Sequence, residues 1–299
     1  MKRFLFYTII VFSVGNLAHP SAASEAERRI LLTRYETIHA LPQSHISDEV
    51  VVDSDTANDL LRADIFGIYQ RPLAVLARTL GDVGEWCEFM PLNLNIKACT
   101  FESTAAGHWL TLYAGRKYYE PPEDAHPLRY HFQVMAQTPT YFRVQLTAAE
   151  GPFGTSDYLI LVEGMAWQAD ATLLRIHTSY QDSLRSRLGT NIYLATLGLG
   201  KVGFTQNGKA QNGETQFVDG VRGIIERNAM RYFLALRAHL DMQGLPAMQR
   251  FTARIQRWFE LTEVYARQLH ELDWPEYQAS KLRERENQAR LQAKIPVPG

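Results

Sequence analysis

Residues 128–180 read LRYHFQVMAQTPTYFRVQLTAAEGPFGTSDYLILVEGMAWQADATLLRIHTSY, and this stretch decides the fold. Every second residue is apolar from Leu128 to Val134, and the same alternation returns from Phe142 to Ala148. A period of two places apolar groups on one face of a β-strand and polar groups on the other. The stretch therefore predicts an antiparallel sheet with one dry face and one wet face.

Five consecutive strands are expected in and around this stretch. Their ranges are 108–119, 128–136, 140–149, 156–168 and 171–180. The connectors are short and carry turn residues, as in Gly151-Pro152-Phe153-Gly154, so strands that are neighbours in sequence should pair as a meander. Earlier strands are expected at 50–53, 61–69 and 92–101, with short helices at 71–81 and 83–89 between them.

A long amphipathic helix follows the strands and can cover the dry face of the sheet. It runs from about Asp219, a residue type suited to a helix N-cap, to Asp241. Its apolar face consists of Val221, Ile225, Ala229, Leu236 and Leu240. The predicted fold class is α+β, with a curved antiparallel β-sheet gripping a long C-terminal α-helix. Between them lies either a solid core or a hydrophobic chamber.

The first 23 residues have the features of a cleaved secretory signal peptide. Basic residues 2–3 precede an apolar run at 4–14, and small residues lead to a cut after Ala23. The alternative is an uncleaved anchor, but this run is short for a bilayer span of roughly 20 residues. We therefore expect a periplasmic or secreted protein with no transmembrane anchor after cleavage.

Composition and charge restrict the class of protein. The hydrophobic content of 46% is that of a globular chain. Without residues 1–23 the chain carries 29 basic and 32 acidic residues, which gives a net charge of −3. The sequence has neither the basic footprint of a nucleic-acid-binding protein nor a polybasic face for anionic lipid. No nucleic-acid partner is expected.

The chain has two cysteines, Cys87 and Cys99. In an oxidising compartment they are expected to form a disulfide, with a pair of buried free thiols as the alternative. A zinc site is less favoured, because two Cys and the nearby His108 do not complete a four-ligand set. No nucleophile elbow, phosphate loop or HExxH spacing is present, so no cofactor and no metal are expected.

The chain changes character after Tyr180. A helix is expected at 184–197, followed by a loop rich in Gly, Asn and Gln at 198–219. Two charged helices are expected at 248–272 and 276–293. The second is almost entirely polar, which favours a solvated helix packed loosely on the body over a helix that docks a partner.

The order of these elements resembles the helix-grip fold of the START-like (SRPBCC) superfamily. The resemblance rests on that order and on the segments IYQRPLAVLARTLGDVGEWCEFMP (68–91) and GVRGIIERNAMRYFLALRAHL (220–240). With its signal and the run ERNAMRYF (226–233), the whole chain is also similar to uncharacterised exported bacterial members. The resemblance implies a fold and a ligand class (lipid, sterol or polyketide-like) but no catalytic residues.

The chain then divides into four parts. These are a signal peptide (1–23), an N-terminal helix and linker (24–49), a START-like domain (50–242) and a helical C-terminal extension (243–299). The loop at 198–219 and the extension go beyond a minimal START-like domain.

The dry side of the sheet and the facing side of the helix supply the residues expected to line a ligand cavity. They are Tyr130, Phe132, Val134, Phe142, Val144, Leu146, Leu174, Ile176, Tyr180, Ile225, Tyr232 and Leu236. Large apolar side chains at these positions can equally fill a core. In START-like proteins, the resemblance implies, the same positions commonly line a cavity.

A few polar residues are candidates for contacts inside such a cavity. They are Arg222, Glu163 and Arg116, with Asp157 as a further acid. A carboxylate on the chamber side would be desolvated and its pKa raised, but a solvent-facing or Arg-paired Glu163 is favoured. Arg227 and Arg231 are like charges four residues apart, a mild cost unless a ligand anion or an acidic side chain lies opposite.

The favoured hypothesis is noncovalent binding of a hydrophobic ligand in the sheet–helix cavity, for transport across the periplasm. The first alternative is an enzyme of cyclase, hydratase or hydrolase type in the same cavity, which requires one of the polar candidates inside it. The second alternative is a protein-interaction module that uses the C-terminal helices. No catalytic residue is assigned.

Overall fold

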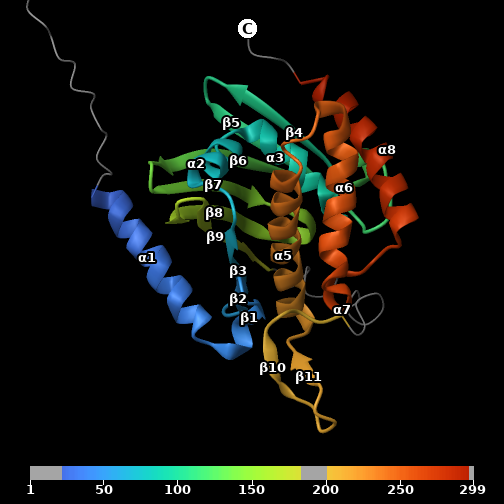
Figure 1. The fold of residues 1–299 in the computed structure, drawn as a ribbon. Coiled ribbons are helices and arrows are strands. Elements are labelled where there is room, and N and C mark those ends of the chain that lie inside the picture. The colour runs from blue at the N-terminus through green and yellow to red at the C-terminus, as the bar shows by residue number, and fades with distance from the viewer. Residues whose placement is uncertain (1–21, 183–200, 296–299) are drawn as a thin grey trace, which may run out of the picture.

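The structure of the protein, a computed structural model, describes residues 22–182 and 201–295 (Figure 1). These residues form one curved nine-stranded sheet of order β1-β2-β3-β9-β8-β7-β6-β5-β4, in which all neighbours are antiparallel. The strands are β1 (His45–Ser47), β2 (Val50–Asp55), β3 (Leu60–Tyr69), β4 (Ile96–Thr104), β5 (Gly107–Ala114), β6 (His126–Gln137), β7 (Tyr141–Glu150), β8 (Ser156–Gln168) and β9 (Ala171–Gln181). A separate hairpin, β10 (Gln206–Lys209) and β11 (Thr215–Phe217), projects from the body.

The meander predicted from the sequence is confirmed, because β4 to β9 pair in chain order. Two strand ranges were too long. The strand expected at 108–119 ends at Ala114, since the chain then turns towards Pro121 and Pro122. The strand expected at 92–101 begins at Ile96, because a 3₁₀ turn around Pro91 precedes it.

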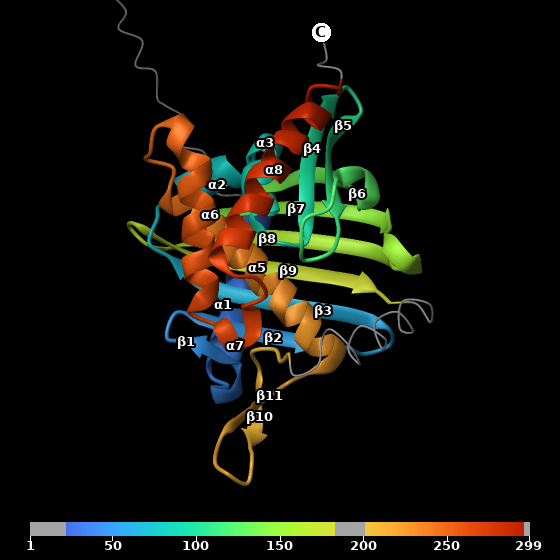
Figure 2. The same ribbon diagram turned by 90° about the vertical axis from the view of Figure 1, so that its right-hand side faces the viewer.

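The inner face of the sheet is covered by α2 (Leu73–Leu80), α3 (Val83–Phe89) and the long α5 (Gly220–Asp241). Helix α5 packs on β2, β3 and β9, and its other side contacts α6 (Ala247–Glu263). In Figure 2 the sheet lies behind α5, with the C-terminal helices in front of it. The predicted α+β, START-like arrangement of a sheet gripping a helix is therefore confirmed.

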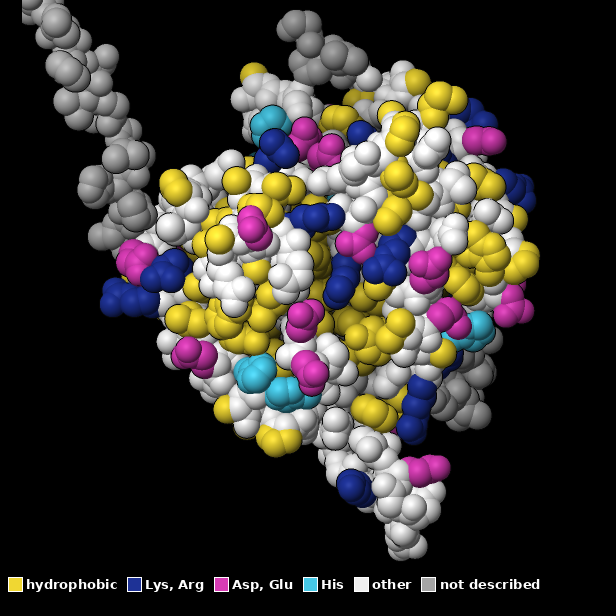
Figure 3. Space-filling model, in the orientation of Figure 1, with side chains coloured by type: hydrophobic (Ala, Val, Ile, Leu, Met, Phe, Trp, Pro, Cys, Tyr) yellow, Lys and Arg dark blue, Asp and Glu magenta, His cyan; other side chains and the backbone are white. Residues whose placement is uncertain are grey.

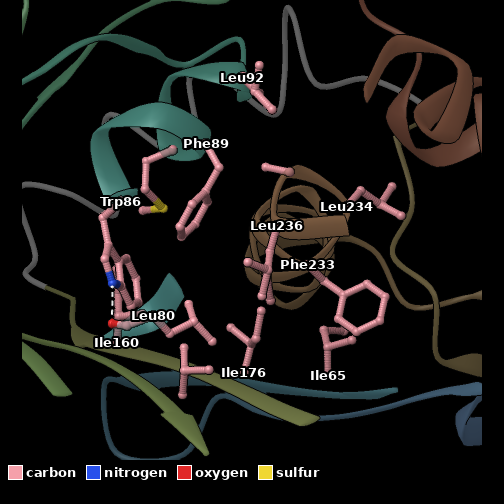
Figure 4. Close-up of a cluster of buried hydrophobic side chains, with 14 of the residues drawn as sticks. Ile65, Leu80, Trp86, Phe89, Leu92, Ile160, Ile176, Phe233, Leu234 and Leu236 are labelled. Atoms are coloured by element: carbon pink, nitrogen blue, oxygen red, sulfur yellow. Dashed lines mark hydrogen bonds between the residues drawn. The ribbon is translucent and has the colours of Figure 1, made fainter. Parts of the chain in front are cut away.

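The interior under the C-terminal half of α5 is a filled core. Trp86 and Phe89 of α3 lie close to Leu236, as Figure 4 shows, and the indole N–H of Trp86 donates to the carbonyl of Leu80 at 2.9 Å. Nearby, Gly67 of β3 leaves room for the ring of Phe233, since a Cβ there would lie 2.3 Å from a ring carbon. The void that remains among Trp86, Phe89 and Leu236 measures only about 10 Å³, which leaves no space for a ligand at this end.

The outer face of the sheet was expected to be wet, and this expectation is wrong for its central strands. Helix α1 (Ala22–His39) packs Leu31, Tyr35 and Ile38 against a second apolar cluster on that face. Its sheet members are Val51, Phe66, Tyr141, Met165 and Leu173. The sheet is thus covered on both faces where α1 lies.

A buried ionic cluster adjoins α1 on the same outer face. Asp64 of β3, only 2% exposed, accepts from Arg175 of β9 at 2.6 Å and contacts His177 at 2.9 Å. Arg175 also pairs with Glu163 of β8 at 3.1 Å. Burial alone would raise the pKa of Asp64, but the hydrogen bond from His177 and the charge of Arg175 outweigh it and lower that pKa to about 2.

The C-terminal extension consists of α6, α7 (Ala266–Leu269) and α8 (Trp274–Gln292). The expectation that the polar helix at 276–293 is solvated and loosely packed is wrong. Lys281 and Glu284 of α8 are each 2% exposed, and Glu284 pairs with Lys281 at 2.6 Å and with Lys97 of β4 at 3.1 Å. The polar face of α8 therefore points into the protein. It packs against the polar edge of strand β4.

Cys87 of α3 and Cys99 of β4 form a disulfide, as predicted, with a Cα–Cα distance of 5.0 Å. Most of the expected signal peptide (residues 1–21) and the expected helix at 184–197 lie outside the described residues. Within the described ranges, no helix has both the length and the apolar character needed to cross a membrane. On the face shown in Figure 3, acidic and basic side chains are interspersed, in line with the near-neutral net charge.

Candidate functional site

A cavity of about 520 Å³ lies between the N-terminal half of α5 and one end of the sheet. The sheet contributes the start of β4, the end of β5, the start of β6, the start of β8 and the end of β9. The lining residues are Asn93, Asn95, Ile96, Leu112, Ala114, Leu128, Tyr130, Pro152, Tyr158, Ile160, Thr178, Tyr180, Ile224, Ile225, Arg227, Asn228, Arg231 and Tyr232. The cavity and the filled core therefore occupy opposite ends of one sheet–helix interior.

Four tyrosines form much of the cavity wall. The rings of Tyr158 and Tyr180 stack with centroids 5.1 Å apart, and Tyr130 meets Tyr158 edge to face at 6.4 Å. Tyr232 faces them from α5. Burial raises the pKa of all four phenols, that of Tyr232 to about 12, so each carries its proton at neutral pH.

These phenols give the wall both apolar and hydrogen-bonding surface. The Tyr158 hydroxyl is held by Thr155 at 2.7 Å. Among the described residues, no hydrogen bond to the hydroxyl groups of Tyr130, Tyr180 or Tyr232 is formed, so these three can donate to a guest molecule.

Part of the cavity lining is polar. Arg227 and Arg231, one helical turn apart on α5, line the cavity together with three asparagines, Asn93, Asn95 and Asn228. Both arginines are buried and held by the protein. Arg227 donates to the carbonyl of Val202 at 3.1 Å, and Arg231 donates to Asn228 at 3.5 Å.

The acid opposite these arginines is Glu271, in the linker between α7 and α8. It pairs with Arg231 and with Lys117, each at 3.1 Å, and lies 3.9 Å from Lys201. Burial alone would raise the pKa of Glu271, but Arg231, Lys201 and Lys117 together lower it. An acidic side chain was one of the two partners considered for these arginines from the sequence. In the structure this acid is Glu271, which belongs to the C-terminal extension.

The predicted cavity residues divide between the cavity and the core. Tyr130, Tyr180, Ile225 and Tyr232 line the cavity. Phe132, Phe142, Val144, Leu146, Leu174, Ile176 and Leu236 are buried in the filled core instead. The period of two identifies which residues of a strand face the interior. It does not show whether other side chains fill the space that these residues face.

Val134 is a correction to the predicted set. It shares the alternation of β6, but it is 43% exposed. The β5–β6 pairing ends at His108 opposite Phe132, and β6 has an irregularity between Val134 and Ala136. The strand therefore runs beyond its neighbour at this point, and Val134 leaves the interior.

None of the polar candidates lines the cavity. Glu163 lies on the outer face, where it pairs with Arg175, as the favoured interpretation held. Arg222 donates to Ser54 at 2.7 Å, and Arg116 and Asp157 are exposed. The enzymatic alternative required one of these side chains inside, so the described residues do not provide the chemistry on which it depended.

Sequence reasoning missed several lining residues for identifiable reasons. Tyr158 and Ile160 alternate with Leu159 and Leu161, which are also apolar. The sequence therefore did not show which of these two sets of residues in β8 faces the interior. Ile160 pairs with Thr178 of β9, and paired residues lie on the same face of a sheet. This pairing would identify the inward-facing residues of β8 once those of β9 are known. Asn93 and Asn95 precede a strand and follow no period, so no sequence signal places them beside a cavity.

No family model matches the sequence, and no curated protein sequence matches it. Among solved structures, a START superfamily protein from Mycobacterium smegmatis is 13% identical with a TM-score of 0.32, over 46% of this chain and 91% of that one. Human STARD10 is 7% identical with a TM-score of 0.38, over 91% and 90% of the two chains. The Zhui aromatase/cyclase from Streptomyces sp. R1128 is 8% identical with a TM-score of 0.32, over 71% and 99%. Identities of this size concern the fold alone.

Proposed function

We propose that the protein binds a hydrophobic small molecule noncovalently in the cavity between α5 and the sheet. The observation that carries this proposal is the cavity volume of about 520 Å³ with aliphatic and tyrosine walls. Small-molecule sites usually measure roughly 300–1,000 Å³ and combine apolar walls with a few polar groups. A ligand of lipid, sterol or polyketide type fits this description.

Binding would be driven by burial of apolar ligand surface. At about 25 cal/mol per Å², burial of about 300 Å² contributes about 7 kcal/mol before the cost of association is subtracted. The phenols of Tyr130, Tyr180 and Tyr232 would then orient the ligand through hydrogen bonds, since they are protonated at neutral pH. Such binding suits a carrier, and we propose that the protein is exported and carries its ligand in the periplasm.

The binding proposal is tested by blocking the cavity. Ala114 lines it, so Ala114→Phe should fill part of the space and weaken binding of an apolar fluorescent probe at least tenfold. The matched control is Ala106→Phe in the exposed β4–β5 turn, which should bind the probe as the parent does. Equal probe affinity in all three proteins would count against the cavity as the binding site.

Native mass spectrometry of protein purified from its own host would identify a bound ligand directly. The expected result is a lipid-sized molecule that is absent from the Ala114→Phe variant. Export is tested separately, by the intact mass of the mature protein, which should begin at Ser24. A chain that retains residues 1–23 would contradict export with cleavage.

A further inference from the structure

Two residues of the cavity lining are buried arginines, and they belong to a cluster of basic residues from several elements. Arg227 and Arg231 lie on the same side of α5, Lys117 follows β5, and Lys201 precedes α5. The two arginines are 2% and 4% exposed and line the cavity. Buried cations this close together repel one another, and their burial is costly unless negative charge faces them.

The protein itself places a carboxylate in this cluster. Among the described residues, the ion pairs of Arg231, Lys117 and Lys201 all converge on one acid, Glu271. The pKa of Lys201 is lowered by burial and further by Lys117, Arg231 and Arg227, although Glu271 is 3.9 Å away. Glu271 is thus the acid that these three cations share, while Arg227 and Arg231 also line the cavity.

Neutral donors complement the cations at the cavity surface. The side-chain oxygen of Asn93 accepts from the backbone N–H of Asn95 at 3.1 Å, and that of Asn228 accepts from Arg231. Among the described residues, neither of these two amide nitrogens donates a hydrogen bond, so both can donate to a guest molecule. Guanidinium groups and amide N–H groups together suit a carboxylate or phosphate, whose oxygens accept several hydrogen bonds at once.

We infer that the ligand is an acidic amphiphile, whose carboxylate or phosphate lies against Arg227 and Arg231 and whose apolar part lies among the tyrosines. This inference rests on the proposed function and specifies the chemistry of its ligand. The charged head forms charge-assisted hydrogen bonds with the two guanidinium groups. The tail is buried against Tyr130, Tyr158 and Tyr180, which line the same cavity.

The test compares probes that differ only in the head group. Decanoate, decyl phosphate and decan-1-ol are titrated at pH 7 against the full chain, with displacement of an apolar fluorescent probe as the readout. The expected result is at least tenfold tighter binding of an acid than of the alcohol. A preference for decyl phosphate over decanoate indicates a phosphate head group, and the reverse indicates a carboxylate.

Charge-removing variants locate the head group. Arg227→Gln and Arg231→Gln should each weaken binding of the preferred acid at least tenfold, so that its preference over decan-1-ol is lost. The control is Arg222→Gln, on the same helix but bonded to Ser54 outside the cavity, which should keep the acid preference. Circular dichroism establishes that each variant is folded, and two arginine variants are used so that one misfolded protein does not end the test.

The outcomes separate the inference from the proposed function. If decan-1-ol binds as tightly as both acids, the inference is overturned while the cavity remains a binding site. If Arg222→Gln loses the acid preference as Arg227→Gln does, the cavity arginines are not the head-group site. If none of the three amphiphiles displaces the probe and Ala114→Phe has no effect on it, the proposed function fails first.

Discussion

The side-chain oxygen of Gln288 on α8 accepts a hydrogen bond from the backbone N–H of Cys99 on β4 at 2.9 Å. The same amide donates to the carbonyl of Cys87 at 3.0 Å. One turn later, Gln292 both accepts from and donates to the backbone of Phe101, each at 2.9 Å. Strand β4 is the last in the sheet, and α8 satisfies backbone groups that an open edge would expose to other chains.

Gln288→Ala should destabilise the protein by about 1–3 kcal/mol, because it leaves buried backbone groups of Cys87 and Cys99 without a partner. Urea unfolding followed by circular dichroism measures the change. Gln256→Ala serves as the control, since Gln256 is exposed on α6 and bonds only to Glu260 among the described residues. A Gln288→Ala protein as stable as this control would show that α8 does not stabilise the edge.

Glu284→Gln should be more damaging, with a loss of about 3–5 kcal/mol, because it leaves Lys97 and Lys281 buried without a carboxylate. The control is Glu286→Gln, the same change at an exposed position on the same helix, which should alter stability by less than about 0.5 kcal/mol. Thermal and urea unfolding of both proteins provide the measurement. Similar effects of the two substitutions would contradict a buried role for Glu284.

Asp64 should make stability depend on pH in the acid range. Its folded pKa of about 2 lies below the ordinary value of 3.8, so the unfolded chain takes up the proton first as the pH falls. The stabilisation, about 2 kcal/mol, is complete above about pH 4 and is lost towards pH 2. Asp64→Asn should therefore flatten the pH dependence of urea unfolding in this window.

Asp53→Asn is the control for Asp64→Asn. Asp53 lies opposite Asp64 in the β2–β3 ladder, but its side chain is 35% exposed and pairs with Arg62. This variant should keep the steep loss of stability between pH 4 and pH 2. The same slope in the parent and in Asp64→Asn would refute the assignment.

Gly67→Ala should cost about 1–3 kcal/mol, because the new methyl group would lie 2.3 Å from a ring carbon of Phe233 and α5 would have to shift. Gly244→Ala, where a Cβ meets nothing within 4 Å, should be close to neutral. Unfolding in urea compares the two. If Gly67→Ala proves harmless, then α5 is not packed tightly on β3.

The fold could be predicted where one side of an element is wet. In β6 and β7 the polar residues alternate with buried ones such as Tyr130 and Val144, so the period of two was legible. In β8 the residues on both faces of the strand are apolar, so the sequence did not show which face is the inner one. The burial of α8 could not be predicted either, because Glu284 pairs with lysine side chains and Gln288 bonds to backbone groups, and neither kind of contact leaves a hydrophobic pattern.

The candidate site could be predicted only in part. Tyr130 and Tyr232 followed from periodicity, because both lie on the inner faces of their elements. The boundary between cavity and core depends on the shapes of Trp86 and Phe89, which enter from a separate helix and fill one end. The pairing of Arg231 with Glu271 joins residues 40 positions apart, a contact that spacing along one helix cannot reveal.

The interior is filled at one end and hollow at the other, and this difference affects which substitutions the protein can tolerate during evolution. The aromatic cluster around Trp86 packs against α5, so substitutions beside Tyr180 at the hollow end should cost less stability than substitutions within the cluster. If the cavity binds a guest molecule as proposed, sequence variation at the hollow end is constrained more by that molecule than by folding. Relatives with a different guest should keep the aromatic cluster and differ mainly around the first turns of α5.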